Sequence, residues 1–374
     1  MVRRLYVHNF RCLENFELPI SGQSSILLIG KNGSGKSTVG RVFEMLQKIG
    51  RGTNRVDELL SAKDLTGGRT DVPVRFEILV EIDDVINEYI IAFEFSEGEL
   101  RVLEEKYSYG GRVHYSRKGS VLHFDMFPKE VEGAVIEIDA HLIALPILYG
   151  GTKFKEWLSR MLVLRPIPSL ITGDSNREVL QPNPAVTDYG AWFSGLLNEK
   201  PGIYGKISDY LKQVMSDFED IQNPLIGKAA HSLEVRFSNK QGSISLPFED
   251  LSDGEKCFMI CALVLAAKDS YGPLLCFWDE PDNYLALSEV GHFVTHLRKS
   301  FQSGGQFIAT SHNPEAIRSF SDDNTLLLYR NSHLEPTIIR PLSELNVKRR
   351  SGCRLDSWRL GTMSVKQAQT PRLN

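Results

Sequence analysis

The sequence has few of the features that would assign it to a class at first sight. Its five cysteines show no C-x-x-C spacing, which argues against a zinc site or a disulfide framework. Lysine and arginine (43) nearly balance aspartate and glutamate (47), so the net charge of −4 gives no global basic field for nucleic acid. The longest apolar runs, such as residues 258–267, are too short to cross a bilayer. No heptad pattern and no internal repeat is evident.

These absences limit where the protein is expected to work. The N-terminus leads directly into an alternating strand pattern, without the charged and apolar regions of a signal peptide. Cys261 and Cys276 lie in apolar runs and are expected to be small core residues. With 374 residues, 42% of them hydrophobic, the chain can bury a large core. We expect a soluble, reduced, cytoplasmic protein with no membrane partner.

Hydrophobic periodicity predicts an α/β fold. Strands are expected at residues 4–10, 16–18 and 26–29, followed by a helix at 39–49. Residues 72–125 then alternate at period two between turn signals, which predicts an antiparallel sheet beside the first strand. From about residue 142 the pattern becomes helical, with a loop at 173–184 and helices at 189–197 and 204–218.

The last third of the chain alternates between strands and helices. After strands at residues 233–237 and 243–248 come a helix at 255–268, a strand at 274–278, a helix at 288–301 and strands at 306–310 and 325–329. Apolar strands separated by helices indicate a mostly parallel sheet with helices on both faces.

A glycine-rich stretch after the strand at 26–29 matches G-x-x-x-x-G-K-[ST] and precedes a helix. The glycines let the backbone curl so that several N–H groups point at an anion, and the helix N-terminus adds partial positive charge. Lys36 is placed to reach the β- and γ-phosphates, and the Ser37 hydroxyl to ligate Mg²⁺. The stretch predicts a nucleoside triphosphate site, with the candidate binding residues Gly30, Lys31, Asn32, Gly33, Ser34, Gly35, Lys36, Ser37 and Thr38.

An acidic pair, Asp279 and Glu280, ends the apolar run at 274–278. The carboxyl edge of a parallel sheet is where doubly wound folds bind ligands. Asp279 is suited to hold Mg²⁺ opposite Ser37, and Glu280 to orient or deprotonate an attacking water. On its own, an acidic pair at a strand end is often only solvated.

Two further groups belong to the same region. His312 follows the strand at 306–310, which would place it on the same edge near a γ-phosphate, although an isolated histidine is as often structural. Ser252, Gly254 and Glu255 open the helix at 255–268 and form a second candidate anion site, with Ser252 as N-cap. An ordinary capped helix without a ligand is the alternative for this group.

The order of these motifs resembles that of ABC-type ATPases. Phosphate loop, L-S-x-G-E, apolar strand with D-E, and strand with S-H follow one another here. The phrases V-H-N-F-R at 7–11, L-S-D-G-E-K at 251–256, D-E-P-D-N-Y-L at 279–285 and T-S-H-N-P at 310–314 are similar to the SMC/RecF/OLD-like branch. The resemblance covers residues 1–50 and 185–330.

The resemblance implies a mechanism and a division into domains. Ser252 and Gly254 of one copy would contact the γ-phosphate bound to another, so that ATP joins two copies head to tail. His312 would be the switch histidine, and Arg11 would lie near the nucleotide. An ABC-type ATPase domain is expected at 1–340, with an antiparallel β subdomain at about 70–126, a helical insertion at about 142–230 and a basic tail at 341–374.

The sequence also departs from its relatives. No glutamine stands out as the Q-loop residue, and no coiled coil lies between the phosphate loop and residue 251. About forty residues follow the last expected strand, well short of a typical nuclease domain. The basic tail favours a solvated segment, or else docking to an acidic partner or nucleic acid.

Three functions compete at this stage. The first is an ATPase subunit of an OLD-like or Septu-like bacterial anti-phage defence system, whose ATP-dependent assembly controls a separate nuclease or toxin. The second is a RecF-like DNA repair ATPase, which the similar length supports and the weak basicity opposes. The third, a transporter ATPase, ranks last because neither a Q-loop nor a compact helical subdomain is legible.

Overall fold

The computed structural model describes residues 1–125, 133–227 and 229–345. The chain divides into two compact units, each described by itself below. The P-loop unit comprises residues 2–159 and 320–345, and the acidic-strand unit comprises Met1 and residues 160–319. Residues 346–374, which carry most of the predicted basic tail, lie outside the described part of the chain.

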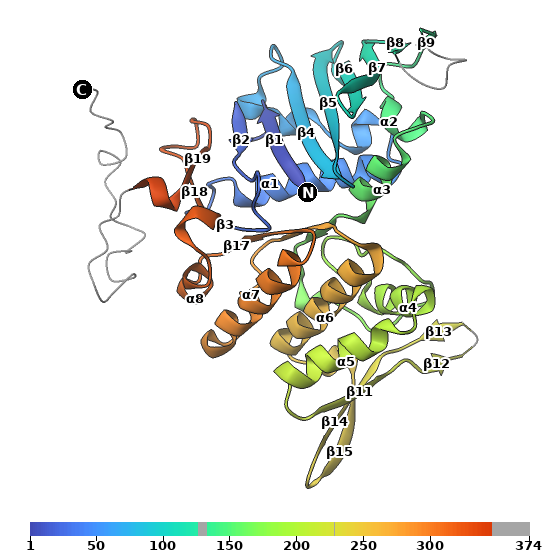
Figure 1. Ribbon diagram of the computed structural model, residues 1–374, viewed down its shortest axis with the longest axis vertical. Coiled ribbons are helices and arrows are strands. Elements are labelled where there is room, and N and C mark those ends of the chain that lie inside the picture. The colour runs from blue at the N-terminus through green and yellow to red at the C-terminus, as the bar shows by residue number, and fades with distance from the viewer. Residues whose placement is uncertain (126–132, 228, 346–374) are drawn as a thin grey trace. The chain divides into compact units, whose positions relative to one another are not determined.

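The P-loop unit contains an eight-stranded antiparallel sheet (Figure 1, blue to teal). Its order is β2-β1-β4-β5-β6-β7-β8-β9, so the first strand pairs with β4 as the sequence predicts. The strands are β1 Val2–His8, β2 Phe16–Leu18, β4 Val74–Ile82, β5 Val85–Ser96, β6 Glu99–Tyr109, β7 Arg112–Lys118, β8 Val121–Phe124 and β9 Val135–Glu137.

Alternation along β4 fixes which face of this sheet is buried. Val74, Phe76, Ile78 and Val80 are at most 1% exposed, whereas the residues between them are partly exposed. The Phe76 ring meets that of Phe10 edge-on at 5.3 Å. Period-two alternation is the pattern of a strand with one face against a core, and it explains why this sheet could be predicted.

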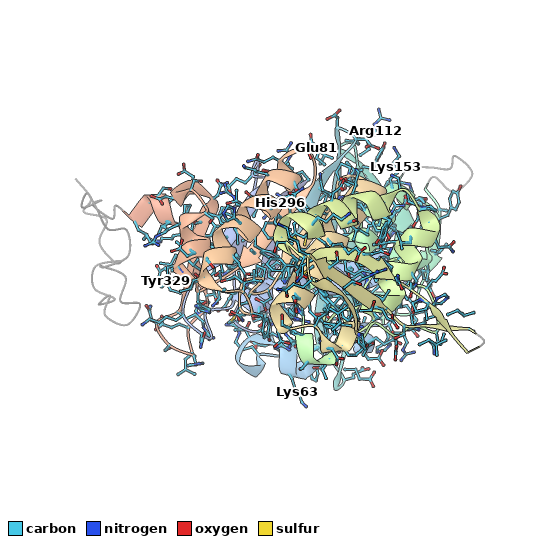
Figure 2. The ribbon with its side chains drawn as sticks, turned by 90° about the horizontal axis from the view of Figure 1, so that it is seen from below. Lys63, Glu81, Arg112, Lys153, His296 and Tyr329 are labelled. Carbon is cyan, nitrogen blue, oxygen red and sulfur yellow. The ribbon has the colours of Figure 1, made fainter. Side chains whose placement is uncertain are left out.

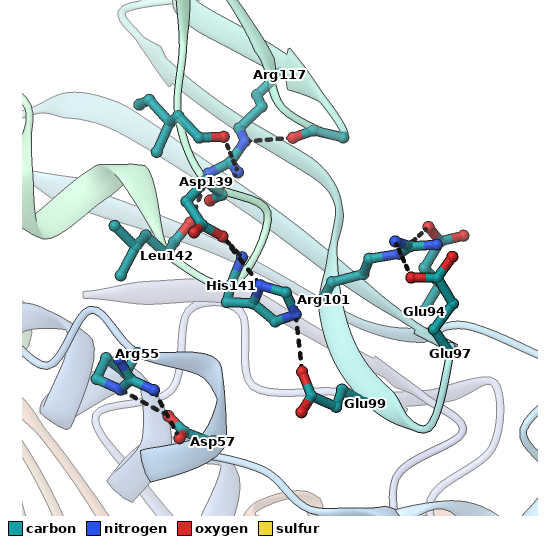
Figure 3. A network of polar contacts seen from close by, with 12 residues as sticks. Arg55, Asp57, Glu94, Glu97, Glu99, Arg101, Arg117, Asp139, His141 and Leu142 are labelled. Atoms are coloured by element: carbon teal, nitrogen blue, oxygen red, sulfur yellow. Dashed lines mark hydrogen bonds and ion pairs between the residues drawn. The ribbon is translucent and has the colours of Figure 1, made fainter.

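A buried polar network fastens β7 to the chain that follows β9 (Figure 3). Arg117 is 1% exposed and donates to the carbonyl oxygens of Gly119, Ile138, Asp139 and Leu142 at 2.6 to 3.2 Å. At the surface nearby, Asp139 and Glu99 flank the ring of His141. The buried guanidinium is satisfied by these carbonyl oxygens and also lies 3.7 Å from the buried Glu105 carboxylate, so this network holds the sheet together.

The rest of the P-loop unit surrounds the glycine-rich stretch. Strand β3 (Ser25–Ile29) is buried throughout and pairs in parallel with β18 (Thr325–Tyr329), which pairs antiparallel with β19 (Ile338–Pro341). Helix α1 (Lys36–Gly50) buries Val39, Phe43 and Leu46. Two short helices, α2 (Ala144–Ile147) and α3 (Thr152–Arg160), follow the antiparallel sheet. Strand β19 was not predicted.

The acidic-strand unit contains three parallel strands, β10 (Leu162–Leu164), β16 (Leu275–Trp278) and β17 (Gln306–Thr310), paired in that order. Helices α4 (Tyr189–Glu199), α5 (Ile203–Val214), α6 (Asp253–Tyr271), α7 (Leu287–Gln302) and α8 (Pro314–Arg318) complete its helical part. Strands β16 and β17 were predicted. Strand β10 was missed, because three apolar residues are too few to show a period.

A smaller antiparallel sheet, in the order β11-β14-β15, also belongs to this unit. Its strands are β11 (Phe218–Gln222), β14 (Glu234–Asn239) and β15 (Gly242–Pro247), and the strands β12 (Leu225–Ile226) and β13 (Ala230–His231) pair with each other. The predicted helix at 204–218 was wrong at its end: α5 stops at Val214, and Phe218 begins β11 opposite Phe237.

The surface and the core follow the expected division of side chains. Lys63 and Arg112 extend outward from the ribbon in Figure 2 and are exposed. Cys261 and Cys276 are completely buried, as predicted for small core residues. Within the residues described, no helix combines the length and apolar character needed to span a membrane.

Candidate functional site

The phosphate loop begins at the end of β3, and glycines form its turn. Gly33 and Gly35 have φ angles of 77° and 103°, in the region that favours glycine. A Cβ atom added to Gly30, whose φ is 151°, would lie 2.1 Å from the carbonyl oxygen of Leu328 on β18. Any larger residue at position 30 would therefore displace β18 or the loop.

Lys36, the first residue of α1, lies across this loop. Its side chain is buried, and Nζ donates to the Gly30 carbonyl oxygen at 2.9 Å. The Oγ atom of Ser34 is buried and has no hydrogen-bond partner within the described residues, whereas Ser37 is exposed. A positive side chain, an unsatisfied hydroxyl and an exposed hydroxyl at a helix start fit a phosphate group.

Arg11 lies at a second turn of the P-loop unit, where its φ is 54°. Its guanidinium Nη2 and Nε donate to Asp64 Oδ1 at 2.6 and 2.9 Å. The next residue, Cys12, places its Sγ 3.7 Å from the Thr38 hydroxyl of α1. The structure therefore brings the N-F-R motif next to the phosphate loop and shows Asp64 as the partner of Arg11, which the sequence did not indicate.

The acidic pair is organised by Thr310, the last residue of β17. Its hydroxyl donates to Asp279 Oδ1 at 2.6 Å and accepts the backbone N–H of Glu280 at 2.9 Å. His312 Nε2 lies 3.3 Å from Glu280 Oε1, and Asn283 donates to the other carboxylate oxygen of Glu280. The structure thus brings three predicted residues, Asp279, Glu280 and His312, into one cluster.

Glu280 adopts a conformation that is unusual for a residue with a side chain. Its φ of 52° lies in the left-handed region, which costs a non-glycine residue about 1 kcal/mol or more. The bond to Thr310 and the contacts of its carboxylate with His312 and Asn283 fix it there. Backbone strain of this kind is concentrated at functional sites, so it supports Glu280 as a candidate catalytic residue.

The signature phrase forms a capped helix start, as predicted. Ser252 Oγ accepts the backbone N–H of Glu255 at 3.3 Å, and the Glu255 carboxylate accepts the N–H and the hydroxyl of Ser252 at 2.7 Å each. A Cβ atom on Gly254 would lie 3.1 Å from the Tyr284 carbonyl oxygen. This places the signature directly against residues 281–285, and shows Glu255 bound to the cap.

Sequence reasoning missed the residues that hold the acidic cluster. Thr310 and Ser311 belong to the T-S-H-N-P motif, but no role of their own was predicted for them. In the structure the Thr310 hydroxyl donates to Asp279, and the Ser311 hydroxyl donates to Asp282 Oδ2 at 2.8 Å. The available signal was the parallel pairing of the two strands. Trp278 pairs with Ala309, so the residues that follow each strand must meet at one edge.

Asp282 is a buried carboxylate with only part of its bonding satisfied. It is 3% exposed, and its Oδ1 has no hydrogen-bond partner in the described residues. Burial raises the pKa of its carboxyl, against the opposing effect of the bond from Ser311. The folded protein therefore favours a proton on Asp282 more than the unfolded chain does.

This burial predicts a pH-dependent difference between the wild type and Asp282→Asn. The protonated Asp282 carboxyl contributes its full stabilisation below the ordinary carboxyl pKa of 3.8, and this contribution is lost as the pH rises through the raised pKa. The free energy of unfolding of the wild type should fall relative to the variant over that range, by about 1.4 kcal/mol per unit of raised pKa. Urea unfolding at several pH values measures it. Asp209→Asn, an exposed control on α5, should track the wild type, and parallel curves for Asp282→Asn would contradict the prediction.

The candidate residues are divided between the two units. Arg11 and the phosphate loop belong to the P-loop unit, whereas the acidic cluster and the signature belong to the acidic-strand unit. Within the described residues no group of three histidine, cysteine or carboxylate side chains is arranged to hold a metal. The hydroxyl of Ser37 and the carboxylate of Asp279 are the hard oxygen donors that Mg²⁺ prefers, so the residue types fit the predicted ion.

Comparison with known proteins assigns the family. The model of the RecF/RecN/SMC N terminal domain matches residues 1–333, so the chain belongs to that family. An Smc head bound to the C-winged helix domain of ScpA has a TM-score of 0.52 at 15% identity, covering 92% of this chain and 99% of that one. An Smc head with an extended coiled coil, bound to the C-terminal domain of ScpA from Pyrococcus furiosus, has a TM-score of 0.50 at 14% identity, covering 92% and 97%.

A short stretch of the chain is similar to an OLD nuclease. An OLD nuclease of Thermus scotoductus is 44% identical over 46 residues, which are 12% of this chain and 8% of that protein. The matched part is thus a small fraction of the nuclease's length. Together these comparisons confirm the predicted SMC/RecF/OLD-like ABC ATPase class and its α/β fold. Proteins of this class in general bind ATP with Mg²⁺ and hydrolyse it.

Proposed function

We propose that this chain binds ATP with Mg²⁺ and hydrolyses it. The observation that carries the proposal is the phosphate loop, in which glycines turn the backbone and the buried Lys36 lies across the turn. The backbone N–H groups of this loop and Lys36 would hold the β- and γ-phosphates. Ser37 and Asp279 would hold Mg²⁺, which when bound neutralises phosphate charge.

The acidic cluster supports a role for Glu280 as the general base. A base must be oriented toward a water molecule, and three neighbours orient this carboxylate or its backbone: Thr310, His312 and Asn283. The Glu280 side chain is 34% exposed, so its carboxylate would accept a proton from the attacking water. In this proposal His312 orients Glu280 and also contacts the γ-phosphate.

ATP binding joins two copies of the chain in this proposal. Ser252 is exposed at the start of α6, where its hydroxyl donates to the Glu255 carboxylate. In this proposal that bond opens when a second copy approaches, and the hydroxyl and the helix N-terminus then contact the phosphate that the second copy holds. The close approach of Gly254 to Tyr284 places the signature beside residues 281–285, of which the exposed Asn283 would line the seam between copies while Asp282 is buried.

Ser252→Arg should leave ATP binding by a single chain intact while it blocks dimer formation. The added side chain fills the space that a partner's phosphate loop would occupy. Fluorescent ATP titration and the molar mass in ATP measure the two properties separately. A variant that still dimerises and hydrolyses ATP at the wild-type rate would contradict the role of Ser252 in a second copy's site.

Ser252→Arg also removes the helix cap, and the effect of that loss must be distinguished from the block of dimer formation. Replacing an N-cap serine costs about 1 kcal/mol. Ser252→Ala loses the same cap without adding bulk or charge, so its melting temperature reports the cost of the cap. It should melt as Ser252→Arg does and keep more of the dimer.

We further propose that the ATP-dependent dimer regulates a separate effector, a nuclease or toxin, in anti-phage defence. The 46-residue match to an OLD nuclease supports this branch. In the two similar structures an Smc head is bound to a domain of a second protein, ScpA, which supports a protein partner for this chain as well.

Affinity purification tests the effector. The Glu280→Gln variant should stay loaded with ATP and retain its partner when it is tagged and purified from its native host with ATP and Mg²⁺. A stoichiometric protein partner, absent from the Ser252→Arg preparation, is the expected result. Co-purified DNA without a protein partner would overturn the effector and favour a RecF-like DNA-binding ATPase.

A further inference from the structure

The segment between β18 and β19, residues 330–337, lies against the phosphate loop although some 300 residues separate them in sequence. Thr337, which is 5% exposed, donates its hydroxyl to the Ser34 carbonyl oxygen at 2.9 Å. Its backbone N–H donates to the Cys12 carbonyl oxygen at 2.8 Å. One residue thus joins the phosphate loop to the N-F-R turn.

Arg330, at the other end of the segment, makes a second connection. Its Nη1 donates to the Gly33 carbonyl oxygen at 3.4 Å, and its Nε donates to the Glu335 carbonyl oxygen at 2.8 Å. The same guanidinium also donates to the His333 carbonyl oxygen. The side chain therefore holds its own loop closed while it reaches the phosphate loop.

Packing at the glycines agrees with these bonds. A Cβ atom on Gly35 would lie 2.8 Å from the Thr337 hydroxyl and 3.0 Å from Cys12 Sγ. A Cβ atom on Gly33 would lie 3.6 Å from His333 Nε2. Residues 33–35, whose N–H groups are expected to face the phosphates, are thus bounded on the outside by residues 330–337 and Cys12.

We propose that residues 330–337 form a strap that holds the phosphate loop in its anion-binding shape, with Thr337 as the positioning residue. Because the Ser34 carbonyl oxygen points toward the strap, the loop's backbone is held from the side that bears the carbonyl. This fixes the orientation of the peptide groups before ATP binds, which lowers the cost of ordering the loop on binding. The inference rests on the proposed function, since it concerns the affinity of this site for ATP.

Thr337→Val removes the hydroxyl at nearly constant volume and tests the proposal. We expect ATP to bind about three- to tenfold more weakly, the effect of one lost hydrogen bond, with KM raised and kcat nearly unchanged. Thr337→Ser keeps the hydroxyl and should restore most of the affinity. Titration with a fluorescent ATP analogue and steady-state hydrolysis provide the values.

Thr325→Val is the matched control. Thr325 is also a buried threonine of the P-loop unit, and its hydroxyl donates to the Ser321 carbonyl oxygen at 2.8 Å, outside the phosphate loop. It should lose thermal stability much as Thr337→Val does and keep the wild-type affinity for ATP.

The outcomes separate this inference from the proposed function. A wild-type protein that binds no ATP defeats both. A wild type that binds ATP, with Thr337→Val equal to it or weakened only as much as Thr325→Val, overturns the strap alone. The strap is supported if Thr337→Val binds ATP more weakly than Thr325→Val does and Thr337→Ser binds it nearly as tightly as the wild type.

Discussion

Replacing Glu280 by glutamine is expected to slow ATP hydrolysis by a factor on the order of 10² to 10⁴ while ATP still binds. This is the usual contribution of a positioned general base. Glutamine keeps the length of the side chain and an oxygen that can accept the bond from Asn283, but it cannot take a proton from water. Single-turnover hydrolysis and ATP titration measure the two steps.

Glu315→Gln is the control for the loss of a carboxylate in the same unit. Glu315 lies on α8, where it pairs with Arg318 at the surface. It should hydrolyse ATP as the wild type does. If Glu280→Gln also hydrolyses ATP at the wild-type rate, the base lies elsewhere, and His312 becomes the next residue to replace.

Lys36→Ala should abolish ATP binding at concentrations that saturate the wild type. The ammonium of Lys36 is the buried positive group of the phosphate loop, and charge-assisted bonds to phosphate are among the strong ones. The loss is therefore expected to be about 10²-fold or more. Alanine also removes the bond to Gly30, which holds the turn. Calorimetric titration with ATP measures the affinity.

Lys48→Ala separates the loss of this charge from an effect on the helix. Lys48 lies on the same helix, α1, where it pairs with Glu44 at 3.4 Å. It should keep the wild-type affinity and melting temperature. Normal ATP binding by Lys36→Ala would refute the assignment of the phosphate loop.

Most of the fold follows from local patterns in the sequence. Strand β4 alternates over nine residues and β16 is uniformly apolar before an acidic pair, so each carries a period or a boundary of its own. The glycines of the phosphate loop are legible for a similar reason, since the turn depends on their conformational freedom. Elements that lack such a pattern, the three-residue strand β10 and the strand β19, were missed.

The organisation of the site depends instead on contacts between distant residues. No residue near Asp279 in sequence indicates that Thr310 is its hydrogen-bond partner, because this contact follows from the pairing of β16 with β17. The pair Arg11–Asp64 joins residues 53 apart, and the bond from Thr337 to Ser34 joins residues 303 apart. A single sequence specifies which groups are present, but their partners are set by tertiary packing.

The central claim is that ATP joins two copies of this chain, and the molar mass of the Glu280→Gln variant tests it most directly. Light scattering after size exclusion should give twice the 42.1 kDa of one chain with ATP and Mg²⁺, and a lower mass without nucleotide. Adding Ser252→Arg to the same protein should return the single-chain mass while ATP stays bound. A Glu280→Gln protein that binds ATP and keeps the single-chain mass across the concentration range would contradict the account.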